Sequence, residues 1–321
     1  MAADTQPALS PQQVEHFLQN GYVHLTGCFS REQAAEWTRD LWTRLGYSPT
    51  DKSTWTQERI NMPSHRTVDV QQFAPTAWKA ICQLLGGEER VSASSSRWTD
   101  GLIVNLGDPS GDNAWVQPRD LKGWHVDGDF FMHYLDSPEQ ALLVIPLFSD
   151  IKEKAGGTMI SPDGIELIAK HLYEHPEGVS PRMTPRGQPP IAEPEGLEFY
   201  NNLIQERCSN FVEATGQVGD VYLLHPLMLH TASRNALRIP RIITNPKVSV
   251  KEPFRFDRSG KGDDTYSIVE QKTLRAIGKP EGLPGWKITA AREEVIPERV
   301  RIQAKMREEE LQRLKEKGLQ N

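Results

Sequence analysis

The spacing of hydrophobic positions predicts helices and one short strand in the N-terminal part of the chain. Residues 10–13, Ser-Pro-Gln-Gln, have the pattern of a capping box with proline in the first helical turn. Residues 22–25 alternate between the two faces of a short strand. A second capping box at residues 30–33 begins an apolar stripe at helical spacing that continues to Leu45, and residues 77–85 predict a further helix.

The pattern changes after Gly86-Gly87, where short apolar segments recur between turn residues. These segments are GLIVNL, WHVDGDFF, ALLVIPLF, GGTMI, GDVYLL and RIITNPKVSV. Segments of about five to eight residues, without regularly alternating helices, are typical of an all-β sandwich or barrel. A helix near residues 165–172 and a loop rich in Pro and Gly at residues 176–196 interrupt them. Together they predict an inserted, lid-like segment at about residues 162–200.

Charged residues dominate the chain from Arg292 onward. Ile302, Met306 and Leu311 form only a thin apolar stripe there, which favours a solvated terminal helix. A dimerisation helix, and with it a homodimer, is the alternative. We expect residues 1–290 to form one domain and residues 291–321 to form this charged helix.

Composition narrows the class of protein. The 321 residues are 37% hydrophobic and 25% charged, which is ordinary for a globular protein. A net charge of −6 does not favour nucleic acid as a partner, and no apolar run is long enough to cross a membrane. The three cysteines are too few and too scattered for a disulfide framework or a thiolate zinc site. With no secretory signal at the N-terminus, the expected location is cytoplasmic.

The stretch GWHVDGDFF places His125 and Asp127 two residues apart in an apolar setting. Alternate side chains of a strand share a face, so we expect the two to project together. An imidazole and a carboxylate, joined by a remote second imidazole, make the facial triad of non-haem Fe(II) oxygenases. H-x-D alone is a weak signal, and a histidine in a packed core is more often structural. Two later histidines, His225 and His230, lie in one segment that runs on to Arg241.

These residues carry a family resemblance. The H-x-D pair is followed far downstream by G-D-V-x-x-x-H-P-x-x-x-H-x-x-x-x-N and then by Arg241. This arrangement resembles the phytanoyl-CoA dioxygenase family of Fe(II)/2-oxoglutarate oxygenases. The opening QQVEHFLQNGYVHLTGCFSREQ is similar to the N-terminal helix–strand–helix of that family, and the likeness extends over roughly residues 10–250. It implies a mainly β fold with flanking α-helices, built on a double-stranded β-helix, or cupin-like jelly-roll, core.

The resemblance also implies a set of site residues. It places Fe(II) on His125, Asp127 and His230 and treats His225 as a structural histidine. It assigns Arg241 to the distal carboxylate of 2-oxoglutarate, although Arg234 and Arg238 lie close by in sequence. The guanidinium group suits two-pronged carboxylate binding. Two further cosubstrate contacts are expected, from the hydroxyl of Thr158 and the amide of Asn105; for Asn105 the alternative is an amide satisfied within its strand.

One position departs from the family. Many members carry Ser two residues after the distal histidine, where this chain has Ala232, flanked by Thr231 and Ser233. Either the carboxylate site lacks one hydroxyl or a neighbour supplies it. Asp127 is present where halogenating relatives carry a small residue, so the resemblance implies hydroxylation or a related oxidation rather than halogenation.

The implied activity is oxidation of a C–H bond, coupled to conversion of 2-oxoglutarate and O2 into succinate and CO2. A small natural product or amino-acid-like metabolite is the expected substrate, with an acyl-CoA thioester second. The basic residues Arg97, Arg119, Lys122 and Arg255 were weighed as anion contacts and are expected to be surface charges. Two rival functions are a non-catalytic jelly-roll module and a zinc hydrolase, but a hydrolase has no use for Arg241 and the sequence has no H-E-x-x-H motif.

Overall fold

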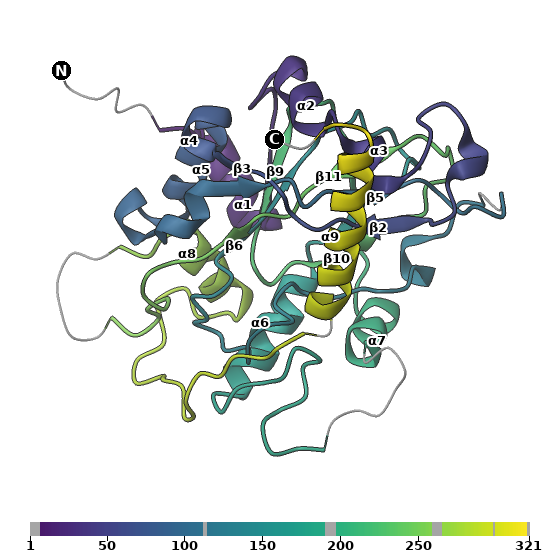
Figure 1. Cartoon of the computed structure of the whole chain (residues 1–321). Coiled ribbons are helices and arrows are strands. Elements are labelled where there is room, and N and C mark those ends of the chain that lie inside the picture. Colours follow the sequence, from purple (N-terminus) through teal and green to yellow (C-terminus); the bar gives the residue numbers. More distant parts are fainter. Residues whose placement is uncertain (1–6, 112–113, 190–196, 259–264, 298, 320–321) are drawn as a thin grey trace, which may run out of the picture.

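Helices surround a core of antiparallel strands in the computed structural model (Figure 1). The structure describes residues 7–111, 114–189, 197–258, 265–297 and 299–319. Its α-helices are α1 (Pro11–Asn20), α2 (Arg31–Thr38), α3 (Leu41–Leu45), α4 (Val70–Phe73), α5 (Pro75–Leu85), α6 (Gly164–Glu174), α7 (Glu198–Glu206), α8 (Ile268–Ala276) and α9 (Arg299–Glu316).

The strands are short, as their spacing in the sequence predicts. They are β1 (Tyr22–Leu25), β2 (Arg59–Asn61), β3 (Thr67–Asp69), β4 (Arg97–Thr99), β5 (Ile103–Asn105), β6 (Leu142–Pro146), β7 (Thr158–Ser161), β8 (Val212–Ala214), β9 (Val221–Leu224), β10 (Leu229–Ala232), β11 (Arg241–Ile243) and β12 (Lys247–Val248). All the pairings between them are antiparallel.

The strands form four small sheets that together give a double-stranded β-helix core. Their orders are β1-β9-β6-β12, β10-β7-β8, β11-β5-β2 and β3-β4. A single bridge between Leu147 and Ile243 joins the first sheet to the third. The sheets are antiparallel and do not close into a barrel, which leaves space between them for a site.

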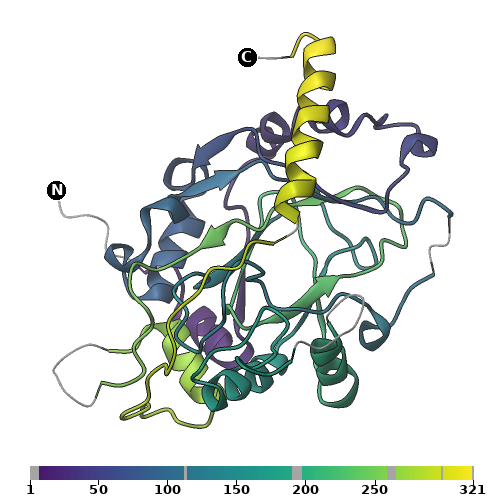
Figure 2. The same cartoon turned by 60° about the horizontal axis from the view of Figure 1, so that its bottom comes forward.

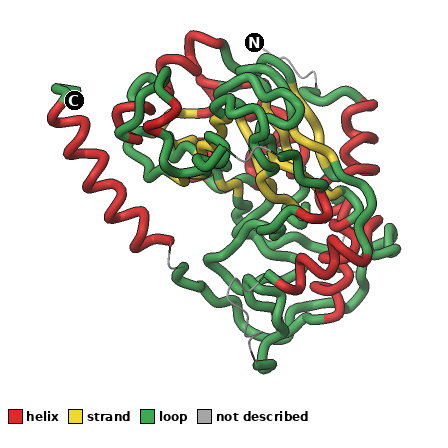
Figure 3. The backbone as a smooth tube through the Cα atoms, turned by 90° about the vertical axis from the view of Figure 1, so that its right-hand side faces the viewer, coloured by secondary structure: helices red, strands yellow, loops and turns green. Residues whose placement is uncertain are grey.

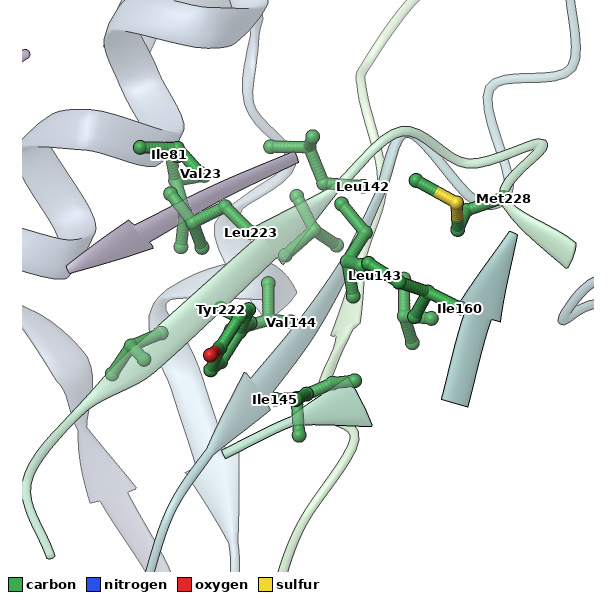
Figure 4. Packing of buried hydrophobic residues seen from close by; sticks show 14 of the residues in the cluster. Val23, Ile81, Leu142, Leu143, Val144, Ile145, Ile160, Tyr222, Leu223 and Met228 are labelled. Carbon is green, nitrogen blue, oxygen red and sulfur yellow. The ribbon is translucent and has the colours of Figure 1, made fainter. Parts of the chain in front are cut away.

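Alternation along β6 separates the packing of the core from the site. Val144 is opposite Leu223 of β9, which in turn is opposite Val23 of β1, and Figure 4 shows this face beneath Ile81 of α5. Successive strand residues face opposite ways, so Leu143 points to the other side. There it lies near Ile160 and Met228 in Figure 4 and lines a cavity. One strand therefore packs against the helices and also walls the site.

Capping signals located the N-terminal helices correctly. Both expected capping boxes are present, at Ser10 and Ser30, and β1 has the expected bounds. The apolar stripe that was expected to run to Leu45 is divided between α2 and α3, however. The backbone at Asp40 has φ −94° and ψ 1°, outside the helical region, so the chain turns there between two shorter helices. Periodicity persists across such a turn because both pieces pack against the same core.

Helices α1, α6 and α8 pack together at one end of the molecule (Figure 2). The expected insertion helix corresponds to α6, whereas α7 and α8 were not predicted. Of the expected loop at residues 176–196, residues 190–196 lie outside the described part. The described stretch before them makes backbone bonds with the segment that follows the H-x-D pair, since His133 N–H donates to Val179 O at 2.8 Å.

Helix α9 is largely exposed to solvent, but it buries Glu310 and Leu314 against the body of the molecule. Ile302 is 57% exposed and Leu311 is 36% exposed, while Glu310 is only 1% exposed. Glu310 Oε2 accepts a hydrogen bond of 2.9 Å from Nε of buried Arg44 in α3. The helix lies along the outside of the molecule in Figure 3, held by this ion pair together with buried Leu314 and partly buried Met306. Within the described residues, no helix is long and apolar enough to cross a membrane.

Candidate metal centre and cosubstrate cavity

His125 and His230 are brought together by an isolated antiparallel bridge. The amide of each donates to the carbonyl of the other, at 3.1 and 3.0 Å. Residues directly opposite one another in an antiparallel pair share a face, and the two ring centroids lie 4.3 Å apart. The expected strand at WHVDGDFF is wrong beyond this bridge, because the chain bends at Asp127 and turns at Asp129. The side chain of Asp127 nevertheless stays on the histidine side.

Backbone carbonyls orient both imidazoles. Nδ1 of His125 lies 2.7 Å from Gly123 O, and Nδ1 of His230 lies 3.0 Å from Met228 O. A carbonyl can only accept, so each Nδ1 carries the proton and each Nε2 keeps its lone pair. Both Nε2 atoms lie 3.5 Å from Oδ1 of Asp127. Three acceptors therefore face one another, an arrangement that a shared cation stabilises.

The electrostatics of the cluster reflect how close the three groups lie to one another. Burial opposes charge on Asp127, yet the neighbouring imidazoles of His125 and His230 hold the pKa of its carboxyl well below the usual range. Burial likewise disfavours the charged form of His125, but the carboxylate of Asp127 outweighs it and raises the pKa of His125. The three ligand atoms all lie within 4.8 Å of one another. Two neutral imidazole nitrogens and a carboxylate oxygen are a donor set suited to Fe(II).

A cavity of about 670 Å³ adjoins the two histidines. We call it the Arg241 cavity; its lining includes His125, His230, Thr158 and Arg241. The side chains of Leu143 and Ile145 from β6 also face it. Its volume lies within the range of about 300–1,000 Å³ that is usual for small-molecule sites.

Arg241 is a buried cation without an acidic partner. It is 2% exposed, and its Nε donates to Gly156 O at 2.7 Å while Nη1 donates to Ile103 O at 3.3 Å. No carboxylate of the described residues forms an ion pair with it within 4.0 Å. Burial lowers the pKa of Arg241 to about 9. A buried charge is costly unless it is paired, so the cavity calls for an anionic ligand.

Sequence comparison identifies the family. The model of the family described as phytanoyl-CoA dioxygenase (PhyH) matches residues 17–242, well over half of the chain. The chain belongs to the phytanoyl-CoA dioxygenase family. It is accordingly an Fe(II)- and 2-oxoglutarate-dependent enzyme of the oxygenase class, with O2 as cosubstrate. No curated protein sequence matches the chain.

Several solved structures are similar to the chain at low identity. The epimerase SnoN from nogalamycin biosynthesis is 15% identical, covers 79% of this chain and 91% of its own, and has a TM-score of 0.35. HygX from Streptomyces hygroscopicus was solved with nickel, 2-oxoglutarate and hygromycin B. It is 12% identical, covers 81% of this chain and 97% of its own, and has a TM-score of 0.43. EctD from S. alaskensis is 16% identical, covers 76% of this chain and 78% of its own, and has a TM-score of 0.39. The family assignment therefore rests on the sequence match.

Thr158 and Ala232 occupy opposite positions in the pairing of β7 with β10. They are register partners, and both line the Arg241 cavity. The neighbours of Ala232 direct their hydroxyls elsewhere: Thr231 Oγ1 donates to Lys122 O at 2.7 Å, and Ser233 Oγ donates to Glu213 at 2.8 Å. Thr158 and Thr231 both line the cavity, but the hydroxyl of Thr231 is bonded to Lys122 O, which leaves Thr158 as the candidate. The position where many members of the phytanoyl-CoA dioxygenase family carry Ser thus has a hydroxyl directly across the ladder.

Asn105 is not brought to the cavity lining. Its Nδ2 donates to Ser233 O and its Oδ1 accepts from Gly107 N, both at 3.1 Å. Both ends of this buried amide are therefore satisfied within the fold, which matches the alternative interpretation of a strand amide. Its strand instead lies between the two arginine-bearing strands, since Arg59 and Arg241 are both register partners of Asn105.

His225 is structural in its contacts. Its Nδ1 accepts from the amide of Leu227, so Nε2 is protonated and donates to Thr273 Oγ1 at 2.9 Å. Burial lowers the pKa of His225 to about 3. The two arginines near Arg241 in sequence are also engaged elsewhere: Arg234 pairs with Asp108, and Arg238 lies 5.8 Å from the centroid of the Trp55 ring. Neither lines the Arg241 cavity.

Sequence reasoning missed three basic residues at the site. Arg59 lines the Arg241 cavity, and Lys247 and Arg299 line a second cavity beside Asp127. No local signal marks them, because Arg59 belongs to a polar stretch without a periodic pattern and Arg299 to a helix expected to be solvated. The four basic residues that were weighed as anion contacts, namely Arg97, Arg119, Lys122 and Arg255, line neither cavity.

Proposed function

We propose that this enzyme oxidises a C–H bond of a small organic metabolite, with Fe(II) held by His125, Asp127 and His230. The observation that carries this proposal is the convergence of the three ligand atoms beside a cavity that contains a buried, unpaired arginine. When bound there, iron would supply the activation of O2 that such oxidation requires. Hydroxylation, desaturation and cyclisation all belong to this reaction class.

The protein residues have separate tasks in this proposal. The carbonyls of Gly123 and Met228 hold the imidazoles with Nε2 toward the metal position. Arg241 binds the distal carboxylate of 2-oxoglutarate, which gives its buried charge a partner. Thr158 adds a hydroxyl from the opposite side of the ladder. Apolar side chains of β6 keep water from that end of the cavity.

The shape and lining of the site favour a small metabolite over an acyl-CoA thioester. The cavity beside Asp127 measures about 570 Å³, and much of its lining is polar. A long acyl chain would leave those polar groups without partners. A natural-product or amino-acid-like substrate fits better. The non-catalytic and zinc-hydrolase alternatives leave the unpaired Arg241 without a purpose.

An anaerobic titration of metal-free protein with Fe(II) and then 2-oxoglutarate tests this function. We expect a metal-to-ligand charge-transfer band in the parent protein and none in His230→Ala. Arg241→Ala should need far more 2-oxoglutarate to develop the band. His16→Ala and Arg301→Ala, which remove exposed side chains outside the site, are matched controls and should behave as the parent. A well-folded parent protein that gives no band would overturn the proposal.

A further inference from the structure

A second cavity adjoins the Arg241 cavity, and the two share His125, Asn61, Ile103 and Asn245 in their linings. We call it the Lys247 cavity; it is lined by His125 and Asp127 but not by His230, Thr158 or Arg241. The two cavities therefore both reach the metal-ligand cluster, one at Asp127 and the other at His230. If 2-oxoglutarate occupies the Arg241 cavity, as the proposed function has it, the Lys247 cavity is left for the substrate.

Polar side chains make up much of this second cavity. Its uncharged polar residues are Asn61, Ser64, Thr99, Gln140, Asn245 and Gln303. They come from segments far apart in the chain, so no local sequence motif predicts that they lie together. Groups of this kind reject an apolar ligand, because it would desolvate them without offering new hydrogen bonds. The lining thus selects a polar molecule.

Of the charged side chains that line the Lys247 cavity, Lys247 is the cation that forms no ion pair within the described residues. Asp127 belongs to the metal-ligand cluster, and Asp129 is held in a two-pronged ion pair by Arg299, whose Nη2 lies 2.8 Å from Oδ1. Lys247 forms no ion pair within 4.0 Å with any carboxylate of the described residues. Its Nζ lies 4.4 Å from the centroid of the Phe130 ring. The carboxylates of Glu139 and Glu294 act on Lys247 from beyond ion-pair distance, so the ammonium group lies beside an aromatic ring without a direct carboxylate partner among the described residues.

The C-terminal segment builds one wall of this cavity. Arg299 and Gln303 come from the first turns of α9, beyond the residues that the family model matches. The segment just before α9 runs beside the H-x-D loop, with Met132 N–H donating to Glu293 O at 2.9 Å and Val295 N–H to Phe130 O at 2.8 Å. The wall is therefore tied to the loop that carries Asp127.

We infer that the Lys247 cavity takes a small polar substrate bearing one carboxylate, and that Lys247 is the specificity-determining residue that binds it. A single unpaired ammonium matches a monoanion, whereas a phosphate dianion would keep one charge uncompensated. Arg299 acts here by neutralising Asp129, which would otherwise repel a carboxylate. This inference rests on the proposed function for the choice of cavity, but binding can be measured without turnover.

Ligand-observed NMR on the full chain, loaded with Zn(II) and saturated with 2-oxoglutarate, tests the inference. The probes are small hydroxy acids, amino acids and sugar acids, each paired with its primary amide and with the matching phosphate monoester. We expect one or more acids to bind about tenfold more tightly than the amide, the usual effect of one charged hydrogen bond. Lys247→Gln should remove this preference, and Lys247→Arg should retain most of it.

Lys251→Gln is the matched control, because Lys251 is exposed, close in sequence and lines neither cavity. An acid held at Arg241 instead would bind Lys247→Gln as well as the parent, and that result overturns the inference. Equal binding of acids and amides, a preference for phosphate esters, or no binding by any acid would overturn it too. A failed iron titration, by contrast, removes the oxygenase function while leaving the acid preference measurable.

Discussion

At the scale of single residues, this site depends on which atoms are already committed to hydrogen bonds. The Nδ1–H groups of His125 and His230 donate to backbone carbonyls, so both Nε2 lone pairs point toward the same position. The hydroxyls of Thr231 and Ser233 donate to Lys122 O and Glu213, while Thr158 lines the cavity. The hydrogen bonds that a side chain already makes within the fold therefore decide its role more than its position in the sequence does.

Replacement of Thr158 by valine tests its assignment to the cosubstrate. The change keeps the branched shape that suits β7 and removes only the hydroxyl. We expect affinity for 2-oxoglutarate to fall about fivefold to tenfold, as for a lost hydrogen bond to a charged group, with Fe(II) affinity unchanged. The charge-transfer titration measures both. Thr158→Ser should bind as the parent does, and an equal loss in Ser and Val variants would argue for packing instead.

Buried His225 makes stability depend on pH. Its pKa in the fold is about 3, below the ordinary value of 6.5. Between these values the unfolded chain binds a proton that the folded chain does not, so stability is complete above about pH 6.5 and is lost as pH falls toward 3. The slope is at most about 1.4 kcal/mol per pH unit.

Urea unfolding of His225→Gln between pH 7 and 4.5 checks this slope. The glutamine side chain does not titrate, so the variant should lose stability less steeply on acidification, even though it is less stable at pH 7. His133, whose pKa burial lowers to about 4, is unchanged and keeps its own contribution. Parallel curves for parent and variant would show that His225 is not the group responsible.

At the scale of elements, a tight turn before β7 holds the arginine of the neighbouring sheet. Gly156 has φ +81°, and its carbonyl accepts the Nε proton of Arg241. A Cβ there would lie 2.6 Å from Nδ2 of Asn105, whose amide is already bonded at both ends. The glycine therefore serves both the backbone conformation and the close approach of two strands.

Gly156→Ala should weaken 2-oxoglutarate binding as well as stability. Strain at positive φ costs about 1–3 kcal/mol, and the clash moves the carbonyl that orients Arg241. Gly187→Ala is the control, because Gly187 has φ +84° but an added Cβ would meet nothing within 4 Å. Thermal unfolding should show a loss in both variants, and the charge-transfer titration a loss in Gly156→Ala alone. Unchanged cosubstrate affinity in Gly156→Ala would contradict this account.

At the scale of the whole molecule, α9 is fastened to the body by a buried cluster of charges. Glu310 accepts from Arg44 and lies 2.8 Å from Nε2 of His65, and Arg44 also reaches Asp100 at 3.0 Å. Removing one member of a buried pair leaves the other charge uncompensated, at a cost of about 3–5 kcal/mol. A buried ion pair, together with the packing of Leu314, therefore holds the helix that walls the Lys247 cavity.

Glu310→Ala should loosen the attachment of α9 while the metal-ligand cluster keeps its ability to bind Fe(II). We expect faster hydrogen exchange throughout α9, weaker binding of acids at Lys247, and an intact charge-transfer band. Glu309→Ala, one residue away on the exposed side, is the matched control and should change none of these. If exchange in α9 stayed as slow as in the parent, the ion pair would not be what fastens the helix.

Local pattern in the sequence accounts for much of this fold. The capping boxes at Ser10 and Ser30, the strand at residues 22–25 and the short apolar segments were all readable, because each depends on neighbours a few positions away. The division of α2 from α3 was not readable. A turn between two helices that pack on one core leaves the periodicity nearly unchanged.

The donor groups of this protein can be identified from its residues alone: two imidazoles and a carboxylate in the right order, an arginine after the last of them, and segments that form strands. Which of these groups meet depends on how the strands pack. The tertiary structure paired His125 with His230, left Arg241 buried without a carboxylate, and brought Lys247 and Arg299 to one cavity. Local periodicity records which face of an element is buried, but contacts between distant segments depend on how those faces pack together.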